Sequence, residues 1–285
     1  MVRALAGHRL AVPPSSARSG DIPEAACSVS RAHTATIRSM SELAMKATEM
    51  ADPCWICGSP ADSGEHKAKK SDLKGEFGTV TQVRPLFLND ANNKNKVVGS
   101  LKSDRLKWPR SMCTHCNGTR TQPYDIAWEH LSQALRDRRP GLKPGDVVRA
   151  SSIFRCDTAR SMQRVHLYFV KALGCVIKAA VNLASVNIDL AGFANAILAG
   201  RSQPDLYIRF GVIASPGGLD VVSASDLSIT SDASTGTCEL ATWFYNVNGI
   251  CALVAYVPDN DLFVRKEHLW HPRQGTSKLV FGDFS

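Results

Sequence analysis

The sequence lacks a long apolar run, and none of its stretches approaches the roughly 18 to 20 apolar residues that a membrane span requires. Aromatic residues are scarce, at 7% of 285 positions, and charged residues account for only 21%. The apolar fraction still reaches 44%, which suffices for a sizeable core. These figures argue against a membrane-spanning protein and against a disordered chain, and they predict a globular protein.

The sequence also lacks the dense, even set of cysteines of a small secreted domain, because it has nine cysteines in a long chain. No signal-peptide core is present, since His8 and Arg9 interrupt the apolar start. We therefore expect a reducing, cytoplasmic setting. Residues 1–50 are rich in Arg, Ser and Ala, and we expect a disordered tail or a start codon assigned too early, with a transit peptide as the alternative.

Acidic residues are scarce in one part of the chain only. The net charge is +8, and residues 61–120 carry 12 basic and 6 acidic side chains, whereas residues 151–285 carry 11 of each. A basic region beside a neutral one favours a polyanionic partner for the basic part. A basic surface that is merely solvated is the alternative interpretation.

A Pro- and Gly-containing linker, residues 140–148, separates two predicted domains. The first spans residues 51–140, with strand-like pieces at 79–83 and 97–98. An exposed loop is expected around 89–95. A helix is expected from Gln122 to the linker, with one apolar face formed by Ile126, Leu131, Ala134 and Leu135.

The second predicted domain spans residues 150–285. Apolar residues near the 3.6-residue period predict a central helix over 158–183, and a shorter helix is predicted over 190–198. The β-type runs that follow are 206–214, 219–229, 238–247 and 250–257. Asn248-Gly249 between the last two predicts a tight hairpin, because both positions favour positive φ. The fold class is therefore α+β, with helices on an antiparallel sheet.

Two CxxC pairs are the most informative motifs: Cys54 and Cys57, followed by Gly58, and Cys113 and Cys116. Four thiolates can close a tetrahedral shell around Zn²⁺, and glycine allows the backbone to turn tightly after the first pair. Between the pairs lie 55 residues, so the metal would join distant segments. The alternatives are a redox CxxC motif and coincidence among nine cysteines.

The order CxxCG, then Glu65-His66, then CxxC-Asn117 resembles the zinc-bearing HNH endonucleases, which have the ββα-metal, treble-clef-like fold. The resemblance covers about residues 53–138. It implies that Glu65 and Asn117 bind one catalytic Mg²⁺ or Mn²⁺, that His66 is the general base, and that the four cysteines hold a separate structural zinc. The gap from His66 to the second CxxC pair is longer than in a minimal HNH unit, and the family's middle Asn has no clear counterpart.

The residue types agree with that chemistry. Carboxylate and amide oxygens suit a hard divalent ion, which stabilises the charge that builds on a phosphate in hydrolysis. A neutral histidine can take a proton from the attacking water. Glu65-His66 alone would more simply be an exposed polar pair, and it is the nearby cysteines that favour the catalytic interpretation.

Further residues are candidates for weaker roles. Arg120 could hold the scissile phosphate and Asp125 could orient a partner, although a structural role is equally open for each. His115 is expected to be an exposed spacer. Phosphate contacts are expected from a lysine-rich segment, for which a solvated face is the alternative: Lys67, Lys69, Lys70 and Lys74. The remaining histidines of the folded part have no ligand-like spacing and are expected to be structural: His130, His166, His268 and His271.

The sequence therefore predicts a metal-dependent endonuclease that hydrolyses phosphodiester bonds in double-stranded DNA. A non-catalytic zinc protein that binds nucleic acid is the alternative, and a protein-interaction scaffold is a third hypothesis. Residues 150–285 offer no recognisable chemistry, and we expect them to bind an effector, select a target or form a homo-oligomer.

Overall fold

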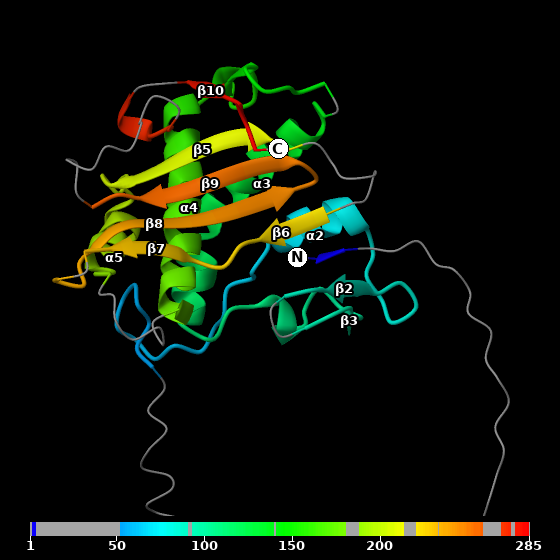
Figure 1. Ribbon diagram of the computed structural model, residues 1–285, viewed down its shortest axis with the longest axis horizontal. Helices are drawn as coiled ribbons and strands as arrows, with labels where there is room; N and C mark the ends of the chain where they lie inside the picture. The colour runs from blue at the N-terminus through cyan, green and yellow to red at the C-terminus, as the bar shows by residue number, and fades with distance from the viewer. Residues whose placement is uncertain are drawn as a thin grey trace, which may run out of the picture. The chain divides into compact units, whose positions relative to one another are not determined.

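The computed structural model describes residues 2–3, 52–90, 93–139, 141–180, 188–213, 221–232, 234–258, 269–274 and 277–284. Its centre is a nine-stranded sheet in the order β11-β5-β9-β8-β6-β1-β2-β3, with β7 paired to β8 (Figure 1). All pairs are antiparallel except β11 with β5. The strands are β1 (Val2–Arg3), β2 (Leu86–Leu88), β3 (Lys96–Val98), β5 (Leu206–Val212), β6 (Val221–Ala224), β7 (Ser228–Ser231), β8 (Cys238–Val247), β9 (Ile250–Tyr256) and β11 (Gly282–Asp283). A separate two-stranded sheet pairs β4 (Val147–Arg149) with β10 (Lys278–Val280).

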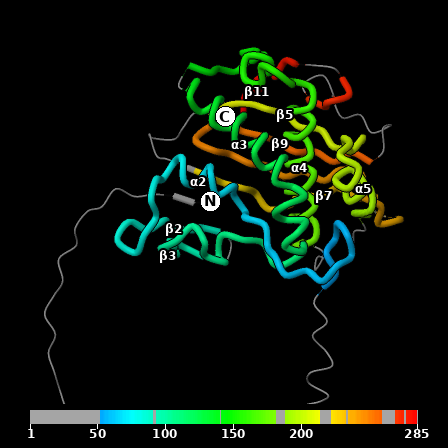
Figure 2. Tube along the Cα trace, turned by 180° about the vertical axis from the view of Figure 1, so that it is seen from behind, coloured from blue at the N-terminus to red at the C-terminus, as the bar shows by residue number. Residues whose placement is uncertain are grey.

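The helices gather on one face of the sheet, as the two opposite views in Figures 1 and 2 show. They are α2 (Lys70–Phe77), α3 (Gln122–Arg136), α4 (Thr158–Ala180) and α5 (Ala191–Ala199). Helix α4 packs against both α3 and α5. Every residue from Val165 to Ile177 is buried, so α4 is the central helix that the sequence predicts.

Several predicted elements are confirmed. The hairpin of β8 and β9 turns at Asn248 and Gly249, whose φ angles are 48° and 80°. Helix α5 ends at Gly200, which adopts a left-handed conformation with φ 63°. The mixed α and β composition with an antiparallel sheet agrees with the predicted fold class, and whether the first part is an HNH fold stays a prediction.

Other predicted elements differ from the structure. Residues 79–83 form bends rather than a strand, and the strand lies at β2 instead. The run 219–229 divides into β6 and β7. Ile126 is not on the buried face of α3, because 58% of it is exposed. Within the expected tail, Val2–Arg3 form β1 and pair with β2 and β6, whereas residues 4–51 lie outside the described part of the chain.

The segments 51–140 and 150–285, predicted as two domains, pack together in one compact unit that includes Asp52–Ser285. The physical reason is a shared core, in which Leu73, Met112 and Trp128 belong to the same cluster as Phe169 and Phe210. Strands β2 and β3 from the first segment also continue the sheet that β6 and β8 from the second segment form.

Candidate functional site

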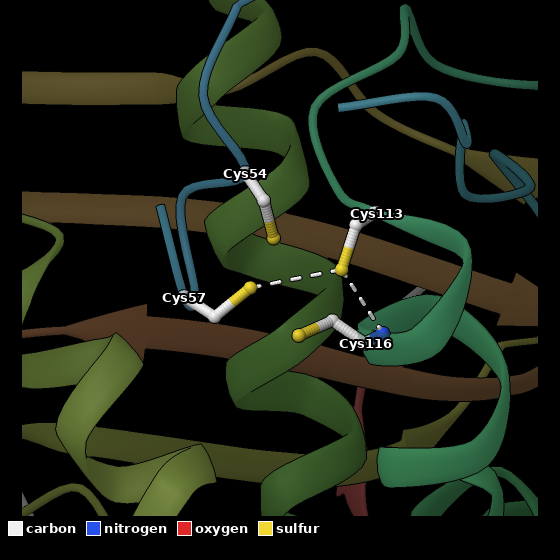
Figure 3. A group of neighbouring side chains, drawn as sticks. All are labelled: Cys54, Cys57, Cys113 and Cys116. Atoms are coloured by element: carbon white, nitrogen blue, oxygen red, sulfur yellow. Dashed lines mark hydrogen bonds between the residues drawn. The ribbon is translucent and has the colours of Figure 1, made fainter. Parts of the chain in front are cut away.

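The two CxxC pairs meet in space, as predicted. The sulfur atoms of Cys54, Cys57, Cys113 and Cys116 all lie within 4.8 Å of one another (Figure 3). The Cys57 and Cys113 sulfurs are 3.6 Å apart, and the backbone N–H of Cys116 donates to Cys113 Sγ at 3.4 Å. Gly58 closes the first turn with a φ of 77°, and its N–H donates to the Cys54 carbonyl at 2.8 Å.

This donor set fits a zinc ion. Four sulfurs placed tetrahedrally at a Zn–S distance of about 2.3 Å are about 3.8 Å from one another, close to the spacing in this cluster. Hydrogen bonds from the side chain and backbone of Ser59 lower the pKa of Cys57 to about 6, whereas burial raises the pKa of Cys113 and of Cys116. Among the described residues, these four side chains form the group that can hold a metal ion such as zinc.

The segment with Glu65 and His66 pairs with the segment that leads into the second CxxC pair. Ser63 pairs with Met112 and His66 pairs with Lys107, both antiparallel. The Ser63 N–H donates to the Met112 carbonyl at 2.8 Å, and the Trp108 N–H donates to the Glu65 carbonyl at 2.7 Å. The two segments therefore form a hairpin whose connection, residues 67–106, contains α2, β2 and β3.

His66 has an orienting partner that sequence reasoning did not find. Its Nε2–H donates to the backbone carbonyl of Leu101 at 3.1 Å, and because a carbonyl only accepts, Nδ1 is left as the basic nitrogen. Burial lowers the pKa of His66, so the ring is neutral at neutral pH. Leu101 lies in the connection of the hairpin. A backbone carbonyl leaves no signature in the sequence.

Asn117 follows the cysteine cluster and contacts the same hairpin. It lies in η2 (Cys116–Arg120), a π-helical turn that precedes α3. Its Nδ2 donates to Ser63 Oγ at 2.8 Å and to the Gly64 carbonyl at 3.4 Å. Its Oδ1 is buried and has no hydrogen-bond partner among the described residues. A buried acceptor without a partner is costly in a protein interior unless a ligand or water binds it.

Glu65 points to a lysine of α4. The side chain of Lys171 is completely buried, and its Nζ lies 2.9 Å from Glu65 Oε2 and 2.7 Å from Asp125 Oδ1. Asp125 also contacts Lys69 Nζ at 3.0 Å. Burial alone would lower the pKa of Lys171, but the two carboxylates outweigh it and raise that pKa well above its usual range. This network of four charges is neutral in sum.

A second buried network lies beside this one and is centred on Asp72 of α2. Trp128 Nε1–H and the Tyr245 hydroxyl donate to its Oδ2 at 3.0 and 2.8 Å, and the Ser132 hydroxyl donates to Oδ1 at 2.7 Å. Burial raises the pKa of Asp72, although these donors and Arg136 oppose the shift. The network joins α2, α3 and β8. Both carboxylate oxygens of Asp72 accept hydrogen bonds from other residues of the protein, which indicates a structural role.

A cavity of about 690 Å³ adjoins the hairpin. Its lining includes Ser63 and Gly64, which Asn117 contacts, and three cations with an indole ring: Lys67, Lys107, Arg110 and Trp108. Lys67 Nζ lies 5.3 Å from the Trp108 ring centroid, in a cation–π contact. Asp62 and Asp104 also line the cavity and offset part of its positive charge. Neither His66 nor Asn117 is among the residues that line this space.

The structure brings only some of the predicted site residues together. Asn117 contacts the hairpin directly, whereas Glu65 is directed to Lys171 and His66 to Leu101. Arg120 is partly exposed at the end of η2, and its side chain makes no hydrogen bond or ion pair with the described residues.

The weaker candidates fall into three groups. His115 is exposed and outside the sulfur cluster, as expected. Lys69 is held by Asp125 and is therefore not available as a phosphate contact, while Lys70 and Lys74 are exposed on α2. His268 lies outside the described residues.

Sequence reasoning missed Lys171, the residue that links this region to α4. A single lysine within an apolar run produces no motif, although its place on the buried face of a predicted central helix is a detectable signal.

In the described part of the chain, no helix combines the length and the apolar character that a membrane span needs. None of the protein-family models, curated proteins or solved structures compared with this chain matches it.

Proposed function

We propose that the protein is a metal-dependent endonuclease that hydrolyses phosphodiester bonds in DNA, with His66 as the general base. One arrangement carries the proposal: a zinc-type cysteine cluster beside a hairpin that bears Glu65 and His66, with Asn117 from the following helical turn in contact with that hairpin. The resemblance to HNH endonucleases rests on the same residues in the same order.

The residues available for a catalytic Mg²⁺ or Mn²⁺ are Glu65 and Asn117. The Lys171 contact uses Glu65 Oε2, so Oε1 remains for a metal, and Asn117 Oδ1 is a buried acceptor without a described partner. Both are hard oxygen donors, which such ions prefer. When bound, the ion supplies stabilisation of the negative charge that develops on the phosphate oxygens.

His66 performs the proton transfer in this proposal. Nδ1 takes a proton from water, the water oxygen forms a bond to phosphorus, and the bond from phosphorus to the leaving oxygen breaks. The Leu101 carbonyl holds the ring through Nε2–H, so the lone pair on Nδ1 has a fixed direction. Because burial lowers its pKa, the imidazole is already in the basic form at neutral pH.

The cavity beside the hairpin supports a nucleic-acid partner. Arg110 can contact phosphates without regard to sequence, and so can Lys67 and Lys107, whose ion pairs with Asp90 at 3.8 Å and Asp104 at 2.8 Å are more exposed than the pair of Lys69 with Asp125. Trp108 offers an aromatic surface against a base or sugar. The cavity adjoins Ser63 and Gly64, immediately before Glu65. A strand held there would contact the hairpin at Ser63, Gly64 and Lys67, on either side of Glu65 and His66 in the sequence.

The test is nicking of supercoiled plasmid by the full chain with Mg²⁺ or Mn²⁺. His66→Ala is expected to lower the rate by at least about a hundredfold, the usual contribution of a general base, while the zinc content stays unchanged and the protein remains folded. Exposed His130 on α3 provides the matched control, since His130→Ala should nick as the wild type does. Equal rates for His66→Ala and the wild type would reject the mechanism.

One observation favours the alternative of a zinc protein that binds nucleic acid without cutting it. Glu65 is only 8% exposed and its charge is already balanced by Lys171, while His66 turns to a different partner. Binding that weakens steeply with salt, without nicking, would support this alternative. An absence of binding even at low salt would support the scaffold hypothesis.

A further inference from the structure

Lys171 is an unusual residue in its position. It lies in the middle of α4 between Val170 and Ala172, both buried, and its own exposure is 0%. Lysine is almost never fully buried unless it is paired, because the loss of hydration of its charge is costly. Its presence in the core of α4 therefore requires a specific interaction.

That interaction reaches the two elements that carry the proposed metal ligands. Nζ contacts Glu65 Oε2 in the hairpin at 2.9 Å and Asp125 Oδ1 in α3 at 2.7 Å. Asp125 follows η2, the turn that contains Asn117, on the same continuous helical segment. One ammonium group thus fixes the position of the Glu65 segment relative to the Asn117 segment.

We propose that Lys171 is a positioning residue for the divalent-cation site. Its ammonium group holds the Glu65 carboxylate in the orientation that allows Glu65 to bind Mg²⁺ or Mn²⁺ together with Asn117. The inference rests on the proposed function. A carboxylate that binds a metal through one oxygen is commonly fixed by a hydrogen bond to the other, and loss of such a partner lowers metal affinity by about 10- to 100-fold. Residues 150–285 then supply a part of the site that the HNH resemblance, at residues 53–138, does not contain.

The experiment is a calorimetric titration of the zinc-loaded full chain with Mn²⁺. Lys171→Met is expected to weaken Mn²⁺ binding at least about tenfold, and Lys171→Arg to restore most of the affinity, because it keeps a charged donor in the same place. The matched control is Lys178→Met, two turns along α4, where the lysine is partly exposed and makes no ion pair with the described residues. It should bind Mn²⁺ as the wild type does. A folded Lys171→Met protein with wild-type affinity overturns the proposal.

Removal of a buried charge can prevent folding, so a second variant is needed. Asp125→Asn removes one of the two carboxylates that hold Lys171 and leaves Glu65 intact. If Lys171→Met does not fold, Asp125→Asn is expected to weaken Mn²⁺ binding about threefold or more, and unchanged affinity in that variant overturns the proposal.

Plasmid nicking by the same samples separates this inference from the proposed function. If Mn²⁺ binding depends on Lys171 but the protein does not nick plasmid, the inference about Lys171 holds and the proposed nuclease activity is rejected. If the wild type nicks plasmid and Lys171→Met binds Mn²⁺ as tightly as the wild type, the proposed nuclease activity holds and the inference about Lys171 is rejected. A wild type that binds no Mn²⁺ rejects both.

Discussion

Cys113 illustrates what one residue contributes to the zinc-type cluster. Its sulfur lies 3.6 Å from Cys57 of the other CxxC pair, so it is a direct link between segments that are 56 positions apart. The same sulfur accepts the N–H of Cys116, which fixes the start of the helical turn that carries Asn117. Loss of this thiol therefore removes a ligand and an anchor of the candidate site.

We expect Cys113→Ser to lose its zinc and to unfold at a lower temperature, because three sulfurs and a hydroxyl bind zinc much more weakly than four thiolates. Metal analysis of the purified protein and a thermal melt provide the measurements. Cys156→Ser is the matched control, since Cys156 is exposed and outside the cluster. A full zinc complement in Cys113→Ser would show that the ligand set is wrong.

The candidate site was predictable from sequence to the extent that it consists of motifs. The four cysteines were predicted and are confirmed as a cluster, because CxxC spacing is a local property. The partners of His66 and Glu65 were not predictable in this way. Leu101 acts through its backbone carbonyl, and Lys171 is about a hundred positions from Glu65 along the chain. Only tertiary packing brings these groups together.

At the level of elements, the hairpin of β8 and β9 is defined by the residues of its own turn. Asn248 and Gly249 form its turn with positive φ at both positions, and Val247 pairs with Ile250 across it. Any side chain at Gly249 would also meet the guanidinium of Arg139 and the carbonyl of Ile213. Both backbone conformation and space therefore require glycine here.

Gly249→Ala is expected to destabilise the protein by about 1 to 3 kcal/mol, because alanine is strained at this φ and the neighbouring groups must move. Urea unfolding measures the change. Gly192→Ala is the comparison: Gly192 is exposed in the first turn of α5, and an added Cβ would make only an ordinary contact with Gln203. That variant should be neutral or slightly more stable, and an equal loss in both variants would refute the argument.

Elements defined by local pattern were predicted well, and elements defined by distant partners were not. Helix α4 and the β8–β9 hairpin follow from periodicity and turn residues. The expected strand at 79–83 fails because β-forming residues need a partner and a core, and Val83 is 89% exposed. Strand β1 could not be found from its two residues, since it exists through pairing with β2 and β6.

At the scale of the whole molecule, buried polar contacts join the helices to the sheet. His166 of α4 is fully buried, and its Nε2–H donates to the Leu206 carbonyl at the start of β5 at 2.9 Å. Burial lowers the pKa of His166 to about 3. The folded protein therefore keeps this ring neutral across a pH range in which the unfolded chain would protonate it.

The free energy of unfolding should fall as the pH drops below about 6.5. The unfolded chain binds a proton at His166 near its ordinary pKa, and the folded protein does not do so until about pH 3, so each pH unit costs about 1.4 kcal/mol from this residue. His66 and His271, whose pKa values burial also lowers, act in the same direction. Urea unfolding at pH 8, 6 and 5 measures the slope, and His166→Gln should make it shallower. A slope that is identical in the variant would contradict the assignment.

The Asp72 network has a consequence for how the chain is made. Asp72 and Tyr245, which share a hydrogen bond, are 173 positions apart. At the usual 5 to 20 residues per second, a ribosome adds the intervening segment in roughly 10 to 35 seconds. During this interval the Asp72 carboxylate lacks the hydrogen bond from the Tyr245 hydroxyl, and the strands β1, β2 and β3 lack β6 and β8, through which they join the rest of the sheet. The cysteine cluster can close early in synthesis, but the core around it has to wait for the last quarter of the chain to leave the exit tunnel.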